Sequence, residues 1–349
     1  MKVLLLPTNI ASDLSHKVRL LKSVGVEAKG LVFGANANQT AEDVRLIDVG
    51  NTPYQRIKNR ASFFAEMYKL VGWADVIHWF WSFGRTKIDK KILQLSGKPG
   101  IVQFGGSDTR IPDMDFDCNP YYRDAFHSGY EYAEFESRER SLANQKDFAD
   151  LGFFPLAFIG TERYTDPKLF PRQFRTWQSV VLSDFEPSFP DPSNKRPLVI
   201  HSPTAPVAKG TRFVLEAIEA LRSRCAFDFE LIQGMRRDQA LEKMRQCDIY
   251  IDQLIIGGHG YAAVEAMAYG KPVLSYINPE IGNDYPLDLP IVNANPDNIA
   301  EVLLGLLSDG VQRHELGLKS RDYAEKYHND RKIALDLIAT YEEVIRAGC

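Results

Sequence analysis

The sequence predicts an α/β protein with two domains, each built on a doubly wound parallel sheet. Apolar runs of strand length alternate with amphipathic helical segments almost throughout the chain, and this alternation is typical of parallel strands covered by helices on both faces. The chain has 349 residues, which is too long for one ordinary hydrophobic core. Two domains are therefore expected.

The N-terminal half supplies the first set of elements. Because β-branched and apolar residues fill short runs bounded by glycine, proline or polar residues, we expect strands there. The expected strands are residues 3–7, 28–33, 44–49, 75–81, 100–104 and 153–159. The expected helices are residues 14–24, 54–71 and 130–150, the last of them in a segment rich in Tyr, Phe, Asp and Glu.

The second half repeats the pattern after a segment in which prolines and acidic residues prevent regular structure. We expect an N-terminal domain of residues 1–183, a linker of residues 184–196 and a C-terminal domain of residues 197–349. The expected strands of this domain are residues 198–201 and 227–232. Its expected helices are residues 211–223, 237–246, 297–308, 311–327 and 330–346.

Composition narrows the class of protein. The chain is 44% hydrophobic and 25% charged, as in a soluble globular protein. Its formal net charge of −4 disfavours a general nucleic-acid binder. No apolar run approaches the roughly 20 residues of a membrane span, and the N-terminal apolar run is too short for a signal peptide. The scattered cysteines, Cys118, Cys225, Cys247 and Cys349, indicate reduced thiols and a cytoplasmic protein.

The most informative segment is residues 248–277, DIYIDQLIIGGHGYAAVEAMAYGKPVLSYI. We expect a buried strand over residues 249–256, a glycine turn, a helix over residues 262–268 and a second strand. A glycine turn at a helix N-terminus presents free backbone N–H groups and the positive end of the helix dipole, which suits a phosphate. Glu265 lies one turn into the helix, where a carboxylate can accept hydrogen bonds from sugar or ribose hydroxyls. An ordinary βαβ turn without a ligand is the alternative.

Two segments of the chain resemble segments of a known protein family. GYAAVEAMAYGKPV resembles the C-terminal-domain signature of retaining glycosyltransferases of the GT-B fold, family 4 type, and VIHSPTAPVAKGTRFVLEAIEAL resembles the first strand, loop and helix of that domain. The resemblance implies two Rossmann-like domains facing a central cleft, with the helix 330–349 packed back on the first. It assigns the donor diphosphate to Lys209 and the helix start, and the ribose to Glu265. The diphosphate residues at the helix start are Gly258, Gly260, Tyr261 and Ala262.

Gln233-Gly234-Met235 follows a strand, so Gly234 and Met235 are candidates for contacts with the base. The chain also departs from the family pattern at three positions. Gly257 stands where many relatives have a Glu that contacts the donor sugar. Residues 204–206 (Thr-Ala-Pro) replace a loop with a phosphate-binding Arg. Gly105 stands where a His often ends an HGSD-like strand. These departures leave the contacts to the donor sugar open.

The remaining candidates belong to the acceptor or to catalysis. GGSDTR follows a strand, so Asp108 is a candidate catalytic residue, together with His259 in the glycine turn; a local Asx-turn is the alternative for Asp108. A buried structural role is the favoured interpretation of His78. Asp113, Asp115 and Asp117 form overlapping DxD triplets, but a metal is not expected there. The candidate acceptor or cleft residues are Gly106, Ser107, Arg110, Tyr121 and Tyr122.

The resemblance therefore implies a hexosyltransferase that moves a sugar from a nucleotide diphosphate sugar to a glycan or lipid-linked glycan with retention. Surface polysaccharide or lipopolysaccharide synthesis at the cytoplasmic membrane face is the expected setting. No cofactor other than the donor substrate and no nucleic-acid partner is expected. The alternatives are a non-catalytic relative that binds sugar, and a relative with epimerase or phosphorylase chemistry. The sequence leaves the base, the sugar, the acceptor and the oligomeric state open.

Overall fold

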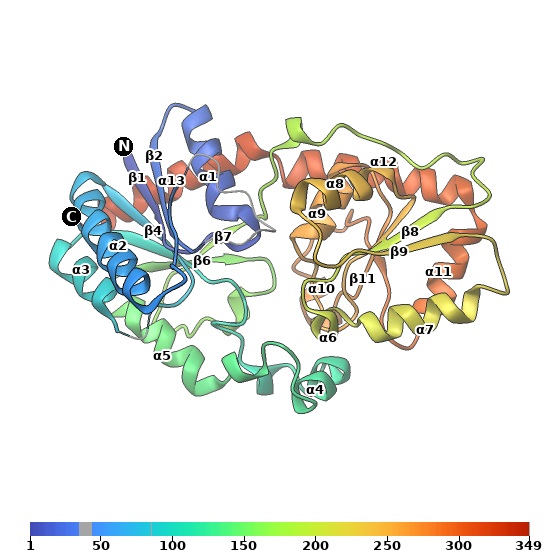
Figure 1. Ribbon diagram of the computed structural model, residues 1–349, viewed down its shortest axis with the longest axis horizontal. Helices are drawn as coiled ribbons and strands as arrows, with labels where there is room; N and C mark the ends of the chain where they lie inside the picture. Colours follow the sequence, from blue (N-terminus) through green and yellow to red (C-terminus); the bar gives the residue numbers. More distant parts are fainter. Residues whose placement is uncertain (35–43, 85, 349) are drawn as a thin grey trace. The chain divides into compact units, whose positions relative to one another are not determined.

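The strands pair in parallel to form two sheets in the computed structural model, which describes residues 1–34, 44–84 and 86–348. The order is β3-β2-β1-β4-β5-β6-β7 in the first sheet and β12-β11-β10-β8-β9 in the second. Helices connect the strands in both sheets (Figure 1). The predicted pair of doubly wound parallel sheets is therefore confirmed.

Two compact units share the chain, and they alternate along the sequence. Unit 1 comprises Met1–Ile111, Phe135–Ser179 and Asp330–Cys349, and unit 2 comprises Pro112–Glu134 and Val180–Asn329. The strands of unit 1 are β1 (Lys2–Leu6), β2 (Glu27–Phe33), β3 (Val44–Ile47), β4 (Val76–Phe80), β5 (Gly100–Gln103), β6 (Phe154–Phe158) and β7 (Phe174–Thr176). Its helices are α1 (Asp13–Ser23), α2 (Pro53–Trp73), α3 (Ile88–Ser96), α5 (Arg138–Ala149) and α13 (Asp330–Gly348).

Unit 2 contains the shorter strands. They are β8 (Leu198–His201), β9 (Asp228–Leu231), β10 (Ile249–Ile251), β11 (Val273–Ser275) and β12 (Val292–Asn293). Its helices are α4 (Pro120–His127), α6 (Pro206–Lys209), α7 (Thr211–Leu221), α8 (Arg237–Gln246), α9 (Tyr261–Ala268), α10 (Pro279–Gly282), α11 (Ile299–Ser308) and α12 (Gly310–Tyr327). Within the described part of the chain, no helix combines the length and the apolar character that crossing a membrane requires.

Residues 112–134 pack in unit 2, whereas the sequence predicted a first domain that runs unbroken to residue 183. Contacts with distant residues explain the difference. The side-chain amide of Asn119 donates to the carbonyl of Ile255 at 2.8 Å, and Glu131 accepts hydrogen bonds from backbone N–H groups of α6. These partners lie 76 or more positions away in sequence, so local patterning carries no sign of them.

Several element boundaries differ from the prediction. The expected strand 249–256 ends at Ile251, and the chain then turns toward the helix α9. The helix expected over residues 130–150 is a short 3-10 turn, Ala133–Phe135, followed by α5. The elements α3, α4 and β7 were not expected. Each is short, and short apolar runs seldom give a clear period.

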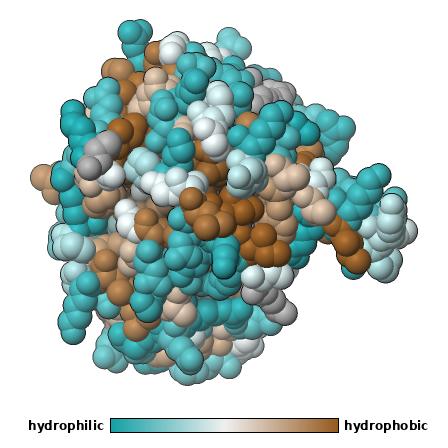
Figure 2. All heavy atoms as spheres, turned by 90° about the vertical axis from the view of Figure 1, so that its left-hand side faces the viewer, coloured by the Kyte–Doolittle hydropathy of each residue, from teal (hydrophilic) through white to brown (hydrophobic). Residues whose placement is uncertain are grey.

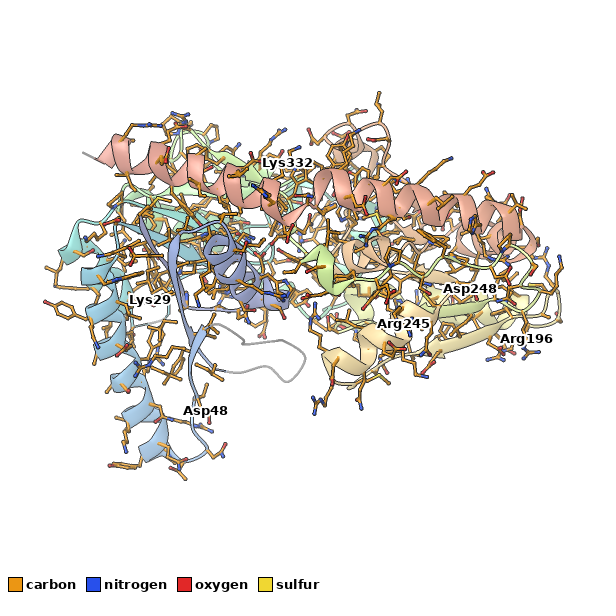
Figure 3. The ribbon with its side chains drawn as sticks, turned by 90° about the horizontal axis from the view of Figure 1, so that it is seen from above. Lys29, Asp48, Arg196, Arg245, Asp248 and Lys332 are labelled. Atoms are coloured by element: carbon orange, nitrogen blue, oxygen red, sulfur yellow. The ribbon has the colours of Figure 1, made fainter. Side chains whose placement is uncertain are left out.

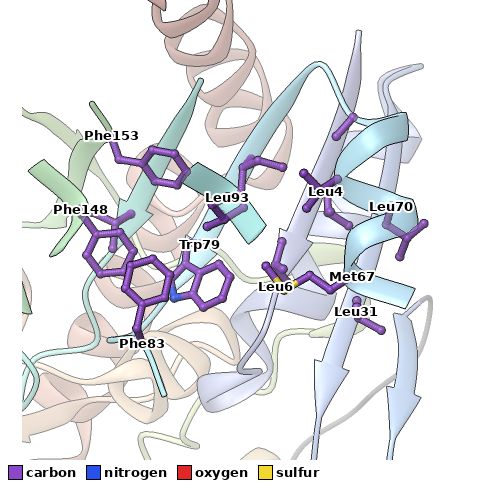
Figure 4. Close-up of a cluster of buried hydrophobic side chains, with 14 of the residues drawn as sticks. Leu4, Leu6, Leu31, Met67, Leu70, Trp79, Phe83, Leu93, Phe148 and Phe153 are labelled. Atoms are coloured by element: carbon purple, nitrogen blue, oxygen red, sulfur yellow. The ribbon is translucent and has the colours of Figure 1, made fainter. Parts of the chain in front are cut away.

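The core of unit 1 lies on both faces of its sheet. On one face, aromatic and aliphatic side chains from β1, β4, α2, α3 and α5 form a cluster around Trp79, Phe83 and Phe148 (Figure 4). The rings of Phe83 and Phe148 stack with centroids 4.2 Å apart. This burial fixes the central strands β1, β4 and β5, and with them the loops that follow their carboxyl ends.

The other face is covered by α1 and α13, so the C-terminal helix belongs to unit 1 (Figure 1). Figure 3 shows Lys332 near the start of α13. The Tyr341 hydroxyl of this helix lies 2.7 Å from Nδ1 of His78, and both side chains are buried. Burial lowers the pKa of His78 to about 3. His78 is thus a neutral core residue, as the sequence favoured.

Candidate functional site

The centre of the candidate site in unit 2 is one buried carboxylate with two partners. Asp252 directly follows β10 and is 2% exposed. Its Oδ1 accepts a hydrogen bond from Nζ of Lys209 at 2.6 Å, and its Oδ2 accepts the backbone N–H of Gly260 at 2.9 Å. Burial alone would raise the pKa of Asp252, but Lys209 and the Gly260 N–H outweigh it and hold that pKa below its usual value. Asp252 is therefore ionised at neutral pH.

Lys209 and Gly260 meet because each lies at a turn beside the carboxyl end of a central strand. Lys209 ends the short helix α6 after β8, and Gly260 is the N-cap residue of α9 after β10. A Cβ atom at Gly260 would lie 3.2 Å from Nζ of Lys209, so a larger residue there would press on the cation. The N-cap residue Gly260 has no side chain of its own to cap α9, and the carboxylate of Asp252 accepts its N–H. Lys209 thus lies beside the start of α9, and its contact with a diphosphate stays a prediction.

The other residues predicted for a diphosphate surround the same turn. Tyr261 and Ala262 are the first residues of α9 and are half-buried. Gly258 is half-buried too, and a Cβ there would lie 3.1 Å from Cδ1 of Ile281. An uncapped helix N-terminus flanked by small residues and a lysine can bind an anion through backbone N–H groups.

Glu265 lies in the second turn of α9 and forms an ion pair with Arg237, the first residue of α8. The helices α8 and α9 pack side by side (Figure 1). Burial raises the pKa of Glu265, and the guanidinium of Arg237 opposes that rise. The sequence pattern singled out Glu265 but gave no sign of Arg237, since the pair joins residues that are 28 positions apart.

The residues predicted to frame the base lie in the loop between β9 and α8. Gly234 is exposed and has a left-handed backbone with φ of +64°, and Met235 is half-buried. This loop leads directly into Arg237. It follows the carboxyl end of β9, the neighbour of β8 in the sheet, so it lies on the side of the sheet that carries Asp252.

His259 precedes the N-cap residue of α9 and is 5% exposed. Its ring centroid lies 5.0 Å from that of Tyr285 and 5.8 Å from that of His328. Burial lowers the pKa of His259 to about 4, although the charge of Asp252 works in the opposite direction. The imidazole is therefore neutral at pH 7 and can donate or accept one proton at a fixed position beside the turn.

Steric contacts explain why a glycine, Gly257, occupies the position at which many members of the resembled family have a Glu. Its backbone is left-handed with φ of +92°, and a Cβ there would lie 2.7 Å from Cβ of Asn278 and 3.2 Å from Nδ2 of Asn119. The carbonyl of Gly257 accepts the N–H of Asn278 at 2.8 Å. The contacts that hold this turn thus occupy the space that a longer side chain would need.

The loop that lacks the expected Arg has a carboxylate beside it. Glu131 accepts hydrogen bonds from the backbone N–H groups of Val207 at 2.8 Å and Ala208 at 2.9 Å, at the start of α6. A protein carboxylate thus satisfies the N–H groups of this loop. Residues 204–206 contain no basic side chain, so this part of the loop supplies no cation.

A second group of predicted residues lies in unit 1, after β5. Oδ1 of Asp108 accepts the N–H groups of Gly105 at 2.9 Å and Gly106 at 3.0 Å, so its side chain bonds to the preceding backbone and not, as in an Asx-turn, to the residues that follow. Burial raises the pKa of Asp108 to about 7. Its Oδ2 has no hydrogen-bond partner among the described residues. Ser107 is also buried, and Arg110 forms an ion pair with Glu136.

Trp81 explains the absence of a side chain at Gly105. A Cβ at Gly105 would lie 2.4 Å from Cε3 of Trp81 and 3.0 Å from Cδ1 of Ile10. Trp81 follows β4, is half-buried and has a φ of +77°, a backbone conformation that a bulky residue rarely adopts. Such strain is often found at functional positions, and no sequence pattern indicates it.

The aromatic residues expected to contact an acceptor have other roles. Tyr122 is 1% exposed and belongs to the core of unit 2, so its ring has no face for a sugar. The hydroxyl of Tyr121 donates to Asp297 at 2.5 Å, and its ring meets that of Tyr276 edge-on. The prediction for Tyr122 is wrong because α4 buries this side of the segment.

The predicted residues therefore form two groups, each within one unit. Unit 2 brings together Lys209, Glu265 and the glycine turn, and adds two residues that the sequence analysis missed, Asp252 and Arg237. A polar residue directly after a buried strand is the signal that could have found Asp252. Unit 1 holds Gly106, Ser107, Asp108 and Arg110.

Comparisons with known proteins agree with this architecture. No protein-family model matches the sequence, and no curated protein compared with it matches either. Solved structures do match. Sucrose-phosphate synthase from Thermosynechococcus elongatus is 13% identical, with a TM-score of 0.63, over 99% of this chain and 100% of that chain.

Two further structures match over similar lengths. WaaG, a glycosyltransferase involved in lipopolysaccharide biosynthesis, is 14% identical with a TM-score of 0.57, over 96% of this chain and 98% of that chain. HepE from Anabaena, in complex with UDP-glucose, is 12% identical with a TM-score of 0.56, over 98% of this chain and 100% of that chain. At these identities the likeness shows the fold, and the chain shares with these proteins the GT-B fold of two Rossmann-like units.

Proposed function

We propose that the protein is a glycosyltransferase that takes a sugar from a nucleoside diphosphate sugar. One observation carries the proposal: Lys209 lies beside the start of α9, and Glu265 lies in the second turn of the same helix, which follows the carboxyl end of β10. This edge of a doubly wound sheet is where such folds bind nucleotides. The solved structures of HepE contain UDP and UDP-glucose, which supports the same ligand class here.

The proposed role of each residue in the transfer reaction follows from the charge on the leaving diphosphate. When the bond between sugar and diphosphate breaks, negative charge grows on the leaving diphosphate. Lys209 and the N–H groups at the start of α9 stabilise that charge, because they are fixed in place before the reaction. Glu265 accepts hydrogen bonds from ribose hydroxyls, and Gly234 with Met235 contacts the base. His259 and Asp108 are the proposed catalytic residues, each buried and close to a glycine turn.

The proposed acceptor is a glycan or lipid-linked glycan, and the proposed outcome is retention of the anomeric configuration. WaaG is involved in lipopolysaccharide biosynthesis, which supports an acceptor of this class. Gly106, Ser107 and Arg110 are the proposed acceptor contacts in unit 1. Cytoplasmic location and contact with the membrane face are part of the same proposal.

The surface of α2 supports a membrane contact. Tyr54 and Ile57 are each 74% exposed in its first two turns, among the exposed cations Arg56, Lys58 and Arg60. Figure 2 shows hydrophobic side chains among hydrophilic ones on this face of unit 1, and Figure 3 shows Asp48 beside the free end of α2. Exposed apolar residues beside cations suit an anionic lipid surface.

A thermal-shift panel of UDP, GDP and ADP tests the donor. A ligand at a hundred times its Kd adds about 2.7 kcal/mol to the unfolding free energy, which a shift in Tm reveals. The Lys209→Ala and Glu265→Ala variants should each weaken binding in calorimetry. If both variants bind the nucleotide as the wild type does, the proposed donor site is wrong.

A non-catalytic relative is the second candidate, and Gly257 favours it, because the usual contact with the donor sugar has no room there. Turnover of any nucleotide sugar, including slow hydrolysis, would exclude this candidate. Interconversion of nucleotide sugars in the absence of an acceptor would instead indicate epimerase chemistry.

A further inference from the structure

We infer that Arg237 is the second cation of the nucleoside diphosphate site and binds a phosphate there. The inference rests on the proposed function and deepens it. It assigns to α8 a role that the resembled glycosyltransferases give to an arginine of the loop after the first strand of this domain. In this chain that loop is residues 204–206, Thr-Ala-Pro.

The loop after β8 cannot supply a second cation. It contains no basic residue before Lys209, and the carboxylate of Glu131 occupies the N–H groups of Val207 and Ala208 at its end. A phosphate placed against these N–H groups would meet a negative charge. The second positive contact must therefore come from another element.

Arg237 lies beside α9, the helix that contains the proposed diphosphate contacts. It begins α8 and pairs with Glu265 of α9, whereas Lys209 and the N-cap residue of α9, Gly260, share the carboxylate of Asp252. Glu265 lies five positions after Gly260, which corresponds to about 7.5 Å along the helix axis. Two cationic side chains therefore lie beside α9. Lys209 lies at its start, and Arg237 lies beside Glu265, the residue proposed to bind the ribose.

The guanidinium of Arg237 has donors to spare. It carries five N–H donors in a planar fork, and its one hydrogen bond among the described residues goes to Glu265. Its side chain is 20% exposed, close to the 19% of Lys209. Glu265 accepts a hydrogen bond from Nη2, and the remaining N–H groups of the guanidinium can donate charge-assisted hydrogen bonds to phosphate oxygens.

Arg236 provides a matched control. It precedes Arg237 directly, but its side chain is 74% exposed and pairs with Asp238, which is 65% exposed. The two arginines have the same charge and nearly the same place in sequence. They differ in burial and in their contact with α9.

Calorimetry with nucleosides and nucleotides of increasing phosphate number tests the role. UDP, UMP and uridine are titrated first, and the GDP and ADP series follow if the uridine series does not bind. Arg237→Ala should weaken binding of the diphosphate by about ten- to a hundredfold and leave binding of the nucleoside unchanged, because one charged hydrogen-bonding partner is lost. Arg237→Lys should recover part of the loss, and Arg236→Ala should bind like the wild type.

Two outcomes would overturn the inference. If Arg237→Ala weakens nucleoside and diphosphate equally, Arg237 only holds Glu265 for the ribose. If the Arg237→Ala variant binds the diphosphate as tightly as the Arg236→Ala variant does, Arg237 makes no contact with the diphosphate. Because Arg237→Ala leaves Glu265 without its partner, the Arg237→Ala/Glu265→Gln variant is compared with Glu265→Gln, which separates phosphate contact from loss of folding. Failure of the wild type to bind any of the nucleotides would instead contradict the proposed function itself.

Discussion

The Nζ of Lys209 lies 2.6 Å from Oδ1 of Asp252, and the same carboxylate accepts the N–H of Gly260 through Oδ2. One buried charge thus fixes both the cation after β8 and the start of the helix after β10. This contact makes a site from segments that are more than 40 positions apart. Because it is formed within unit 2, it holds the proposed phosphate contacts in place before any ligand arrives.

The Asp252→Asn variant should be less stable than the wild type by about 3 kcal/mol, because it leaves Lys209 without its charged partner in a half-buried place. The pKa of Asp252 lies below its usual value. The contribution of its ionised carboxylate to stability is therefore present when the pH is above the usual pKa, and it is lost as the pH falls through the lowered pKa. Urea unfolding at pH 7 measures the difference.

Asp228→Asn is the control, since Asp228 pairs with Arg196 and both side chains are more than half exposed. Its urea midpoint should match that of the wild type. Equal losses in the two variants would mean that the pair of Lys209 and Asp252 has no special role.

The sequence predicted what depends on local patterns. The alternation of strands and helices, the glycine turn and the place of Glu265 all follow from periodicity, glycine spacing and a short motif. Asp252 was hidden inside an apolar run that looks like one strand from residue 249 to 256, although the strand ends at Ile251. Residues 112–134 were misplaced because their partners are far away in sequence, and no local pattern encodes such contacts.

Gly257 should not tolerate any side chain. The Gly257→Ala variant is expected to lose about 2 kcal/mol or more of unfolding free energy, because it adds a clash with Asn278 to the cost of a left-handed backbone. Gly234→Ala is the matched control, since Gly234 also has a positive φ but no atom within 4 Å of the added Cβ. The difference between the unfolding free energies of the two variants, measured by chemical denaturation, gives the cost of the clash alone. Equal losses would mean that the packing around Gly257 has no part in excluding the Glu of the family pattern.

Asp108 should make stability depend on pH. Its pKa is about 7 in the folded protein and near 3.8 in the unfolded chain, so the folded state keeps a proton that the unfolded state releases. Its contribution is therefore full below about pH 4 and is lost as the pH rises through 7. An Asn side chain stays neutral throughout, so Asp108→Asn should gain about 4 kcal/mol relative to the wild type between pH 4 and pH 8. Urea unfolding at both pH values checks this gain, and a constant difference between the two proteins would show that Asp108 is ionised when folded.

The exposed end of α2 should bind anionic membranes. Ile57→Asp places a negative charge among the cations of this helix, and it should reduce sedimentation with vesicles of phosphatidylglycerol and phosphatidylcholine. Leu95→Asp is the control, because Leu95 is 75% exposed on α3. Equal sedimentation of both variants, or none for the wild type in low salt, would remove α2 from the proposed membrane contact.

Trp81 and Gly105 should be coupled in stability. Gly105→His restores the side chain of the family pattern, but it drives a Cβ to 2.4 Å from the indole, so we expect a loss of about 1–3 kcal/mol. Trp81→Ala opens that space and carries its own loss of packing. In the double variant the histidine occupies the vacated space, so the combined loss should fall short of the sum of the single losses by about 1 kcal/mol or more.

Gly72→His controls for the histidine itself, since Gly72 lies in α2 with an ordinary φ and open space around it. This variant should be as stable as the wild type or more so, because glycine is a poor residue inside a helix. Strict additivity of the Trp81 and Gly105 changes would mean that the indole does not occupy the place of the missing histidine. Coupling would instead show that this chain has exchanged the histidine of the family pattern for a tryptophan that follows the neighbouring strand.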